Sequence, residues 1–199
     1  MSYITLATLH NINPKPNMQV RFTQNQLTEL FKASASKLFQ KDVNSILDGV
    51  SEPMLCSRMA IYMENLFLDY KIEGNYYADT EFNRKQNGKV KTIIDDQMQV
   101  IRIKCDLLLH SRGEEIPDNL ITVEMKKSSR PAFHKAADRK RLRAMTKKQD
   151  VYPTDGTTYP EHVCGYIIGI YMEIDKNKRT CLFEKYKGGD MIQSWSLTF

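Results

Sequence analysis

The sequence contains no long apolar run, no C-x-x-C pair and no internal repeat or low-complexity segment. No stretch is apolar for long enough to span a bilayer, and the N-terminus lacks the basic-then-apolar pattern of a signal peptide. We therefore expect a cytoplasmic protein without a membrane segment. The four cysteines lie far apart in apolar surroundings, which indicates buried, reduced thiols and argues against a disulfide framework or a zinc site.

The composition is that of an ordinary globular protein. The chain has 199 residues, of which 41% are hydrophobic and 27% charged, and this length suits one domain with a full core and a small N-terminal addition. We expect residues 1–50 to form a helical extension and residues 51–199 to form the main domain.

Hydrophobic periodicity and turn residues predict the order of the elements. One or two helices are expected over 24–48, after a loop at 11–17, and a helix capped by Ser51 is expected over 51–70. The remaining pattern predicts strands 76–84, 98–110 and 119–127, a helix over 132–148, and strands 162–174 and 179–186 joined by a turn at 175–178. From residue 51 the order is α-β-β-β-α-β-β. The fold class is therefore α/β or α+β, with a mixed central sheet flanked by helices.

One apolar strand ends in charged residues, in the stretch ITVEMKKS (121–128). Successive side chains of a strand alternate between its faces, so Glu124 and Lys126 share one face and Met125 lies on the other. The simpler interpretation is that Glu124 and Lys126 belong to a solvated ion pair at a strand end, which contributes little to stability. However, Asp106 is the only acid in the apolar end of the preceding strand. If the two strands are neighbours, Asp106 and Glu124 converge at one end of the sheet.

Two carboxylates that share a space repel each other and favour a divalent cation between them. Mg²⁺ in proteins typically binds one or two carboxylates together with phosphate oxygens and water. The ion activates a water and neutralises charge on a phosphate, and Lys126 beside it would orient that water. We therefore expect Asp106 and Glu124 to hold Mg²⁺ (or Mn²⁺) and Lys126 to act in phosphodiester hydrolysis.

The pattern D…E-x-K in this order of elements resembles the PD-(D/E)xK nuclease superfamily, which has the restriction-endonuclease-like fold. The resemblance extends over about residues 51–185 and is closest to a group of small bacterial and mobile-element members. The stretches that carry it are EFNR (81–84), DLLLHSRG (106–113), NLITVEMKKS (119–128) and the helix DRKRLRAMT (138–146). The proline that names the superfamily is Cys105 here. The resemblance implies a metal-dependent nuclease that acts on DNA.

Many members of the superfamily add an acid from the first core helix, and two glutamates compete for that role. Glu52 is in phase with the inward-facing row Cys56, Met59 and Met63, whereas Glu64 points about a third of a turn away. We prefer Glu52 as a further catalytic and metal-binding carboxylate. The alternative is that Glu52 only complements the helix dipole in the first turn.

Two other residues are candidates for support of the site. Glu81 lies on the first strand, where it is either structural or in a supporting shell. His110 lies four residues beyond Asp106 on the same strand face, so it either lines the cleft or is an ordinary histidine at a strand end.

Basic charge is concentrated directly after the E-x-K strand. Residues 126–148 contain ten Lys or Arg against one acid, a local balance of +9, so the rest of the +5 chain sums to −4. Such a segment is either a solvated helix face or a surface that binds a polyanion by releasing counterions. The residues expected to contact a phosphodiester backbone are Lys127, Arg130, Arg139, Lys140, Arg141 and Arg143.

The sequence therefore predicts a Mg²⁺-dependent nuclease with DNA as its partner. The sequence leaves open whether the substrate is DNA or RNA and whether the protein forms a homodimer. The alternative function is a non-cleaving module that binds nucleic acid or a protein partner and keeps the nuclease fold.

Overall fold

A computed structural model describes residues 21–81, 92–94, 100–102, 105–147 and 164–199, with 92–94 and 100–102 described by their backbone alone. The expected loop at 11–17 and residues 82–84 of the expected 76–84 strand lie outside these residues. Among the helices that are described, none is both long and apolar enough to cross a bilayer.

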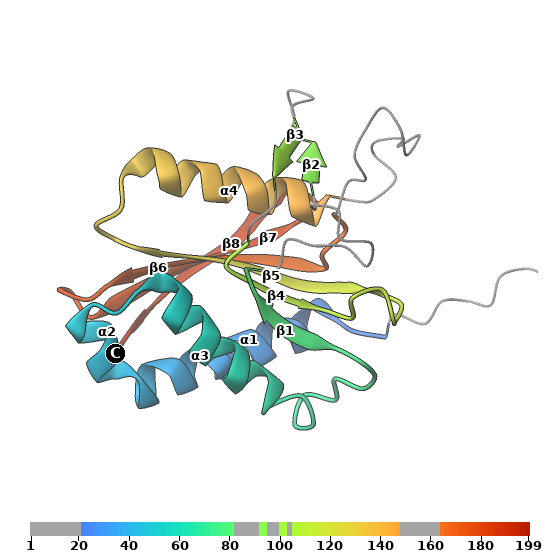
Figure 1. Cartoon of the computed structure of the whole chain (residues 1–199), viewed down its shortest axis with the longest axis horizontal. Helices are drawn as coiled ribbons and strands as arrows, with labels where there is room; N and C mark the ends of the chain where they lie inside the picture. The colour runs from blue at the N-terminus through green and yellow to red at the C-terminus, as the bar shows by residue number, and fades with distance from the viewer. Residues whose placement is uncertain (1–20, 82–91, 95–99, 103–104, 148–163) are drawn as a thin grey trace, which may run out of the picture.

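The protein is built around a mixed six-stranded sheet in the order β1-β4-β5-β6-β7-β8. Strands β5 and β6 are parallel and the other pairs are antiparallel, which confirms the expected mixed sheet and α/β class. Helices α1, α2 and α3 cover one face and α4 covers the other (Figure 1). A separate antiparallel pair, β2 and β3, contacts α4.

Most helices begin at the residues that the sequence signals indicate. The elements are α1 (Gln24–Lys41), α2 (Val43–Asp48), α3 (Glu52–Glu64), β1 (Tyr77–Thr80), β2 (Thr92–Ile94), β3 (Val100–Arg102), β4 (Leu107–His110), β5 (Asn119–Lys127), α4 (Ala132–Thr146), β6 (Ile168–Asp175), β7 (Thr180–Lys187) and β8 (Asp190–Thr198). Ser51 caps α3 by accepting a hydrogen bond from the Met54 N–H, and Thr23 and Gln26 form a capping box at α1.

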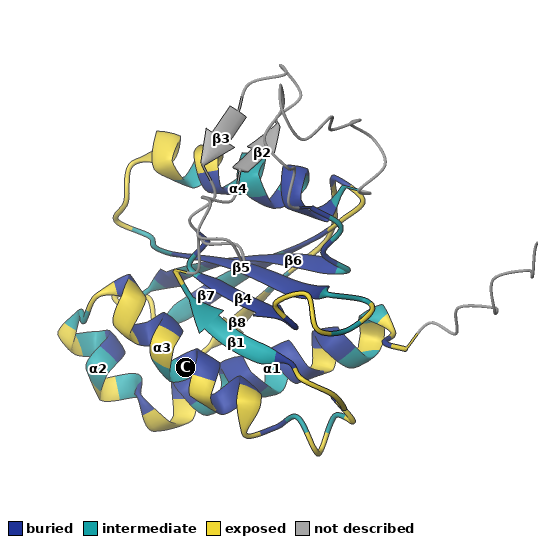
Figure 2. Cartoon of the chain, turned by 45° about the vertical axis from the view of Figure 1, so that its right-hand side comes forward, coloured by how far each residue is buried: buried dark blue, intermediate teal, exposed yellow. Residues whose placement is uncertain are grey.

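Most of the apolar core lies between the sheet and helices α1 to α3 (Figure 2). The expected N-terminal extension contributes directly to it, since the Phe31 ring of α1 packs edge-on against Phe183 of β7 at 5.7 Å. The α4 side has two smaller clusters, which contain Leu142 and Met145 of α4. Gly169 of β6 allows the close approach of α4, because a Cβ there would lie 2.9 Å from Thr146 Cγ2. All four cysteines are buried thiols, as expected.

Several expectations about element bounds are wrong: β1 ends at Thr80, so Glu81 does not lie on the first strand, and β6 begins at Ile168 rather than at residue 162. The single strand over 98–110 is two strands, β3 and β4, which belong to different sheets. Asp106 lies just before β4, and its carboxylate accepts a hydrogen bond from the Met125 N–H; short acids compete in this way with regular backbone pairing. Helix α3 ends at Glu64 rather than Tyr70, and turns follow it. Strand β8 was not predicted, because its mostly exposed residues show no clean alternation.

Candidate functional site

The three residues of the D…E-x-K pattern meet at one end of the sheet. Strands β4 and β5 are antiparallel neighbours, with Leu107 opposite Val123, so Asp106 lies beside the end of β5. Asp106 Oδ2 accepts hydrogen bonds from the Met125 N–H at 2.8 Å and from Lys126 Nζ at 3.2 Å. The strand pairing therefore brings the predicted acid and lysine into direct contact.

Helix α4 closes this end of the sheet from above. Glu124 is fully buried and points toward α4, where Arg141 donates a hydrogen bond to each of its carboxylate oxygens, at 2.7 and 3.1 Å. The same guanidinium is paired with Asp138, one turn earlier on α4. Asp138 Oδ2 in turn lies 3.2 Å from Lys126 Nζ. Two residues of α4 thus connect both ends of the E-x-K motif.

Helix α3 supplies a fourth carboxylate at its N-terminus. Glu52 is buried and its Oε1 accepts hydrogen bonds from the Lys127 N–H at 3.0 Å and from Arg130 Nε at 2.9 Å. Its Oε2 lies 4.0 Å from Lys126 Nζ. Glu64, the competing acid, is exposed and accepts a hydrogen bond from the Ala78 N–H instead. Of the two candidates, the structure therefore brings only Glu52 to the E-x-K strand.

The carboxylates outnumber the cations at this site. The acids are Glu52, Asp106, Glu124 and Asp138, and the bases are Lys126, Arg130 and Arg141, so four negative charges meet three positive ones when all are ionised.

Burial and neighbouring charges change the ionisation of this set. Burial raises the pKa of Glu124 to about 8; the Asp106 charge adds to this rise and the hydrogen bonds from Arg141 oppose it. Burial also raises the pKa of Asp106, against the attraction of Lys126. The pKa of Glu52 is lowered, because hydrogen bonds from Arg130 and the Lys127 N–H outweigh the effect of burial.

The oxygen-rich donor set is of the type that Mg²⁺ and Mn²⁺ prefer. In the ranges that the structure describes, no three His, Cys, Asp or Glu side chains are grouped so that they could hold a metal as they stand. The reason is that the protein's own cations lie between the acids: Lys126 contacts Asp106 and Asp138, and Arg141 holds Glu124. A divalent ion would have to displace such an internal cation.

The basic segment is largely neutralised by acids from distant parts of the chain. Arg139 donates to both oxygens of Glu184 at 2.8 and 2.9 Å, and Lys135 lies 2.6 Å from Glu173. These pairs attach α4 to strands β6 and β7. Of the expected phosphate contacts, Arg139 is therefore paired on the sheet and Arg141 lies inside the carboxylate cluster.

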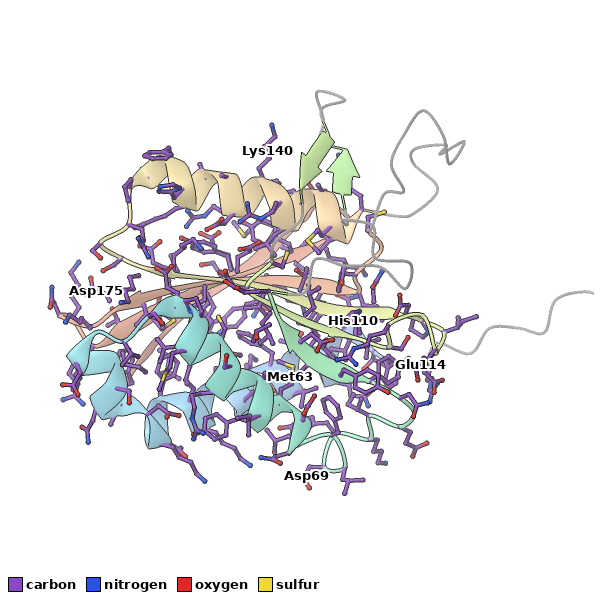
Figure 3. The ribbon with its side chains drawn as sticks, in the orientation of Figure 1. Met63, Asp69, His110, Glu114, Lys140 and Asp175 are labelled. Carbon is purple, nitrogen blue, oxygen red and sulfur yellow. The ribbon has the colours of Figure 1, made fainter. Side chains whose placement is uncertain are left out.

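The other expected phosphate contacts differ in their surroundings. Lys127 Nζ donates to the Gly49 carbonyl at 2.8 Å. Arg143 is 44% exposed and donates to the Gly189 carbonyl at 3.1 Å. Lys140 points away from the sheet (Figure 3). Arg130 is 52% exposed although it is bonded to Glu52. Among the described residues of this segment, Arg130 and Arg143 therefore keep partly exposed side chains near the two ends of α4.

The two supporting candidates lie in different places. Glu81 is exposed with a left-handed φ of 52°, and its N–H donates to the Asp106 carbonyl at 3.4 Å, so it adjoins the site. His110 lies at the opposite end of β4, fully buried, with Nε2 3.0 Å from Asp79 Oδ2. Arg112 also binds Asp79; despite burial, these hydrogen bonds hold the pKa of Asp79 well below its usual range. His110 thus supports a separate ion-pair cluster.

The sequence predicts no role for Asp138, and it predicts that Arg141 contacts a phosphodiester backbone rather than Glu124. A signal was available, because Asp138 is the only acid of a strongly basic segment and Arg141 follows it at the i+3 spacing of one helix face. Which face of the helix would meet the sheet was not readable from the pattern.

No protein-family model, curated protein sequence or solved structure matches the chain.

Proposed function

We propose that this protein is a metal-dependent nuclease of the PD-(D/E)xK type that hydrolyses phosphodiester bonds, with DNA as its substrate. The observation that carries the proposal is the meeting of Asp106, Glu124 and Lys126 at one end of strands β4 and β5. The order of the elements along the chain supports a restriction-endonuclease-like core: helix α3, the antiparallel strands β1, β4 and β5, helix α4 and then β6, which is parallel to β5.

Asp106 and Glu124, with Glu52 beside them, would hold Mg²⁺ or Mn²⁺. When bound, the ion would lower the pKa of a water and neutralise charge on the phosphate. The Lys126 ammonium would orient that water and stabilise negative charge on the phosphate. Its ionised form is favoured here, because Asp106 and Asp138 raise the pKa of Lys126 against the effect of burial.

A cleavage assay tests this function directly. Supercoiled plasmid and end-labelled DNA and RNA oligonucleotides are incubated with the protein in Mg²⁺, Mn²⁺ or EDTA. We expect metal-dependent cleavage that falls by roughly 10²-fold or more in Lys126→Ala, as for loss of a general acid–base group. The control Lys178→Ala removes a lysine that is 79% exposed, and it should cleave normally. No cleavage of any substrate with either metal would contradict the proposal.

A second candidate is a nucleic-acid-binding or partner-binding module that keeps this fold without cleaving. The observation that favours it is the occupation of both Glu124 oxygens by Arg141. Fluorescence anisotropy with labelled DNA over a series of salt concentrations distinguishes the two. Binding that is equally tight in EDTA and Mn²⁺, from a preparation that cleaves nothing, would favour the binding module.

A further inference from the structure

The Lys126 ammonium occupies a position surrounded by oxygen atoms. Its Nζ lies 3.2 Å from each of three oxygens, Asp106 Oδ2, Asp138 Oδ2 and the Met125 carbonyl, and 4.0 Å from Glu52 Oε2. These oxygens come from α3, β5, α4 and the bend before β4. Carboxylate and carbonyl oxygens are the donors that hard divalent cations take in proteins. The ammonium therefore stands where four elements present the ligands of a cation.

Asp138 is the unexplained member of this set. Its side chain is 5% exposed, and its Oδ2 accepts no hydrogen bond from any residue that the structure describes, although the ammonium faces it as an ion pair. Its other oxygen is held by Arg141. Apart from this ion pair the oxygen has no partner among the described residues, and a buried acid on an otherwise basic helix needs a reason.

A purely structural role would be to attach α4 to the sheet. That attachment already exists elsewhere: Arg139 is bonded to Glu184, Lys135 to Glu173, and Leu142 packs on the sheet below α4. The Asp138–Lys126 pair is therefore not required for docking of α4. It does, however, direct a carboxylate oxygen to the same point as Asp106.

We propose that Asp138 is a further ligand of the divalent ion, together with Asp106 and the Met125 carbonyl, so that α4 supplies part of the metal site. This rests on the proposed nuclease function. Lys126 is the internal cation that keeps these oxygens together in the metal-free protein. With the ion bound, the ammonium would move off these oxygens but stay beside the ion, where it would orient the water, and Arg141 would continue to hold the second oxygen of Asp138.

Calorimetric titration of Mn²⁺ into the full chain tests the proposal without an activity measurement. Asp138→Asn should weaken Mn²⁺ binding by about tenfold or more, the size expected when a residue that holds a metal site is lost. The matched control is Asp190→Asn, which makes the same change of charge at a side chain that is 84% exposed. It should change the affinity by less than about twofold, because solvent and salt screen such a charge.

A second measurement covers the case in which Asp138→Asn does not fold. In Lys126→Met the carboxylates of Asp106 and Asp138 face each other without their ammonium, so Mn²⁺ should raise the Tm of this variant more than that of the wild type. An equal rise in both proteins would overturn the proposal, as would unchanged Mn²⁺ affinity in folded Asp138→Asn. If the wild type cleaves DNA with Mn²⁺ while Asp138→Asn binds the metal normally, the nuclease function stands and the role of Asp138 falls. Failure of the wild type to bind Mn²⁺ overturns the role of Asp138 whatever the cleavage assay shows.

Discussion

The two faces of the central sheet are packed in different ways. Toward α1, α2 and α3 the sheet presents one large apolar cluster, in which Met125 and Val123 of β5 are buried. Toward α4 it presents two small apolar clusters and a row of ion pairs that includes Glu124 and Lys126 of the same strand. One face is held by burial of apolar surface, which needs no particular partner. The other depends on matched charges, so each residue there depends on another.

Strand β5 shows why one element can serve both purposes. Its alternation directs Val123 and Met125 to the apolar core and Glu124 and Lys126 to α4. The rigid apolar face fixes the strand, and the strand fixes the position of the charges on its other side. A site built on such a strand is positioned more accurately than one built on a loop.

The largest effect on stability is expected on the apolar face. Met59 of α3 is fully buried, and Met59→Ala should lower the free energy of unfolding by roughly 4 kcal/mol, through lost apolar burial and the cavity left behind. Met54→Ala makes the same chemical change on the same helix, where the side chain is 37% exposed, and should cost less than about 1 kcal/mol. Urea unfolding followed by circular dichroism measures both. Equal losses would show that the α3 face is not the main source of stability.

On the charged face, loss of one partner should cost more than loss of both. Arg141→Met leaves Glu124 buried without its guanidinium, and we expect a loss of roughly 3 kcal/mol. The double variant Glu124→Gln/Arg141→Met should lose less than half of that, because position 124 is then neutral and Asp138 keeps its ion pair with Lys126. A double-mutant cycle from urea unfolding at one pH gives the coupling between the two residues. Additive losses would mean that the pair is not coupled.

The two acids with strongly shifted pKa values should give opposite pH dependence. Burial raises the pKa of Glu124 to about 8, so between its unfolded value near 4.5 and about 8 the folded protein binds more protons than the unfolded one. Stability from this group is therefore present at low pH and is lost as the pH rises through that window. Asp79 has a lowered pKa, so its contribution is lost only as the pH falls below the usual range of an aspartate.

Unfolding measured at several pH values in wild type and Glu124→Gln checks this. The stability difference between the two proteins should change between about pH 5 and 8 and be constant above, while both lose stability alike in acid. A difference that does not change with pH would show that Glu124 has an ordinary pKa in the folded protein.

The smallest effect on stability is expected at the exposed end of the basic helix. Arg143 is 44% exposed, so Arg143→Gln should change the free energy of unfolding by no more than about 0.5 kcal/mol. If α4 binds DNA, the same change should weaken binding to all sequences and lower the salt slope by about one. Arg139→Gln is the contrasting variant, since Arg139 is already bonded to Glu184. It should cost more stability and leave the salt slope nearly unchanged.

Local patterns in the sequence determined much of the arrangement of the helices and strands. Helix caps at Ser51, the alternation of β5 and the helical phase of Glu52 depend on residues within a few positions of one another, and each appears in the structure as expected. The pairing of β4 with β5 was a condition of the predicted site, and the structure meets it. These features together place Asp106 beside Lys126.

Only the tertiary structure decided which charges meet. Arg130 is 78 residues from Glu52, and Arg139 is 45 residues from Glu184, so no local period links these partners. The sequence therefore showed a basic segment of charge +9, whereas the fold distributes acids from α3, β5, β6 and β7 over it. The entry of Asp138 and Arg141 into the site depends on which face of α4 rests on the sheet. That is set by the packing of Leu142 and Met145, a choice between nearly equal faces that the period of a helix does not make by itself.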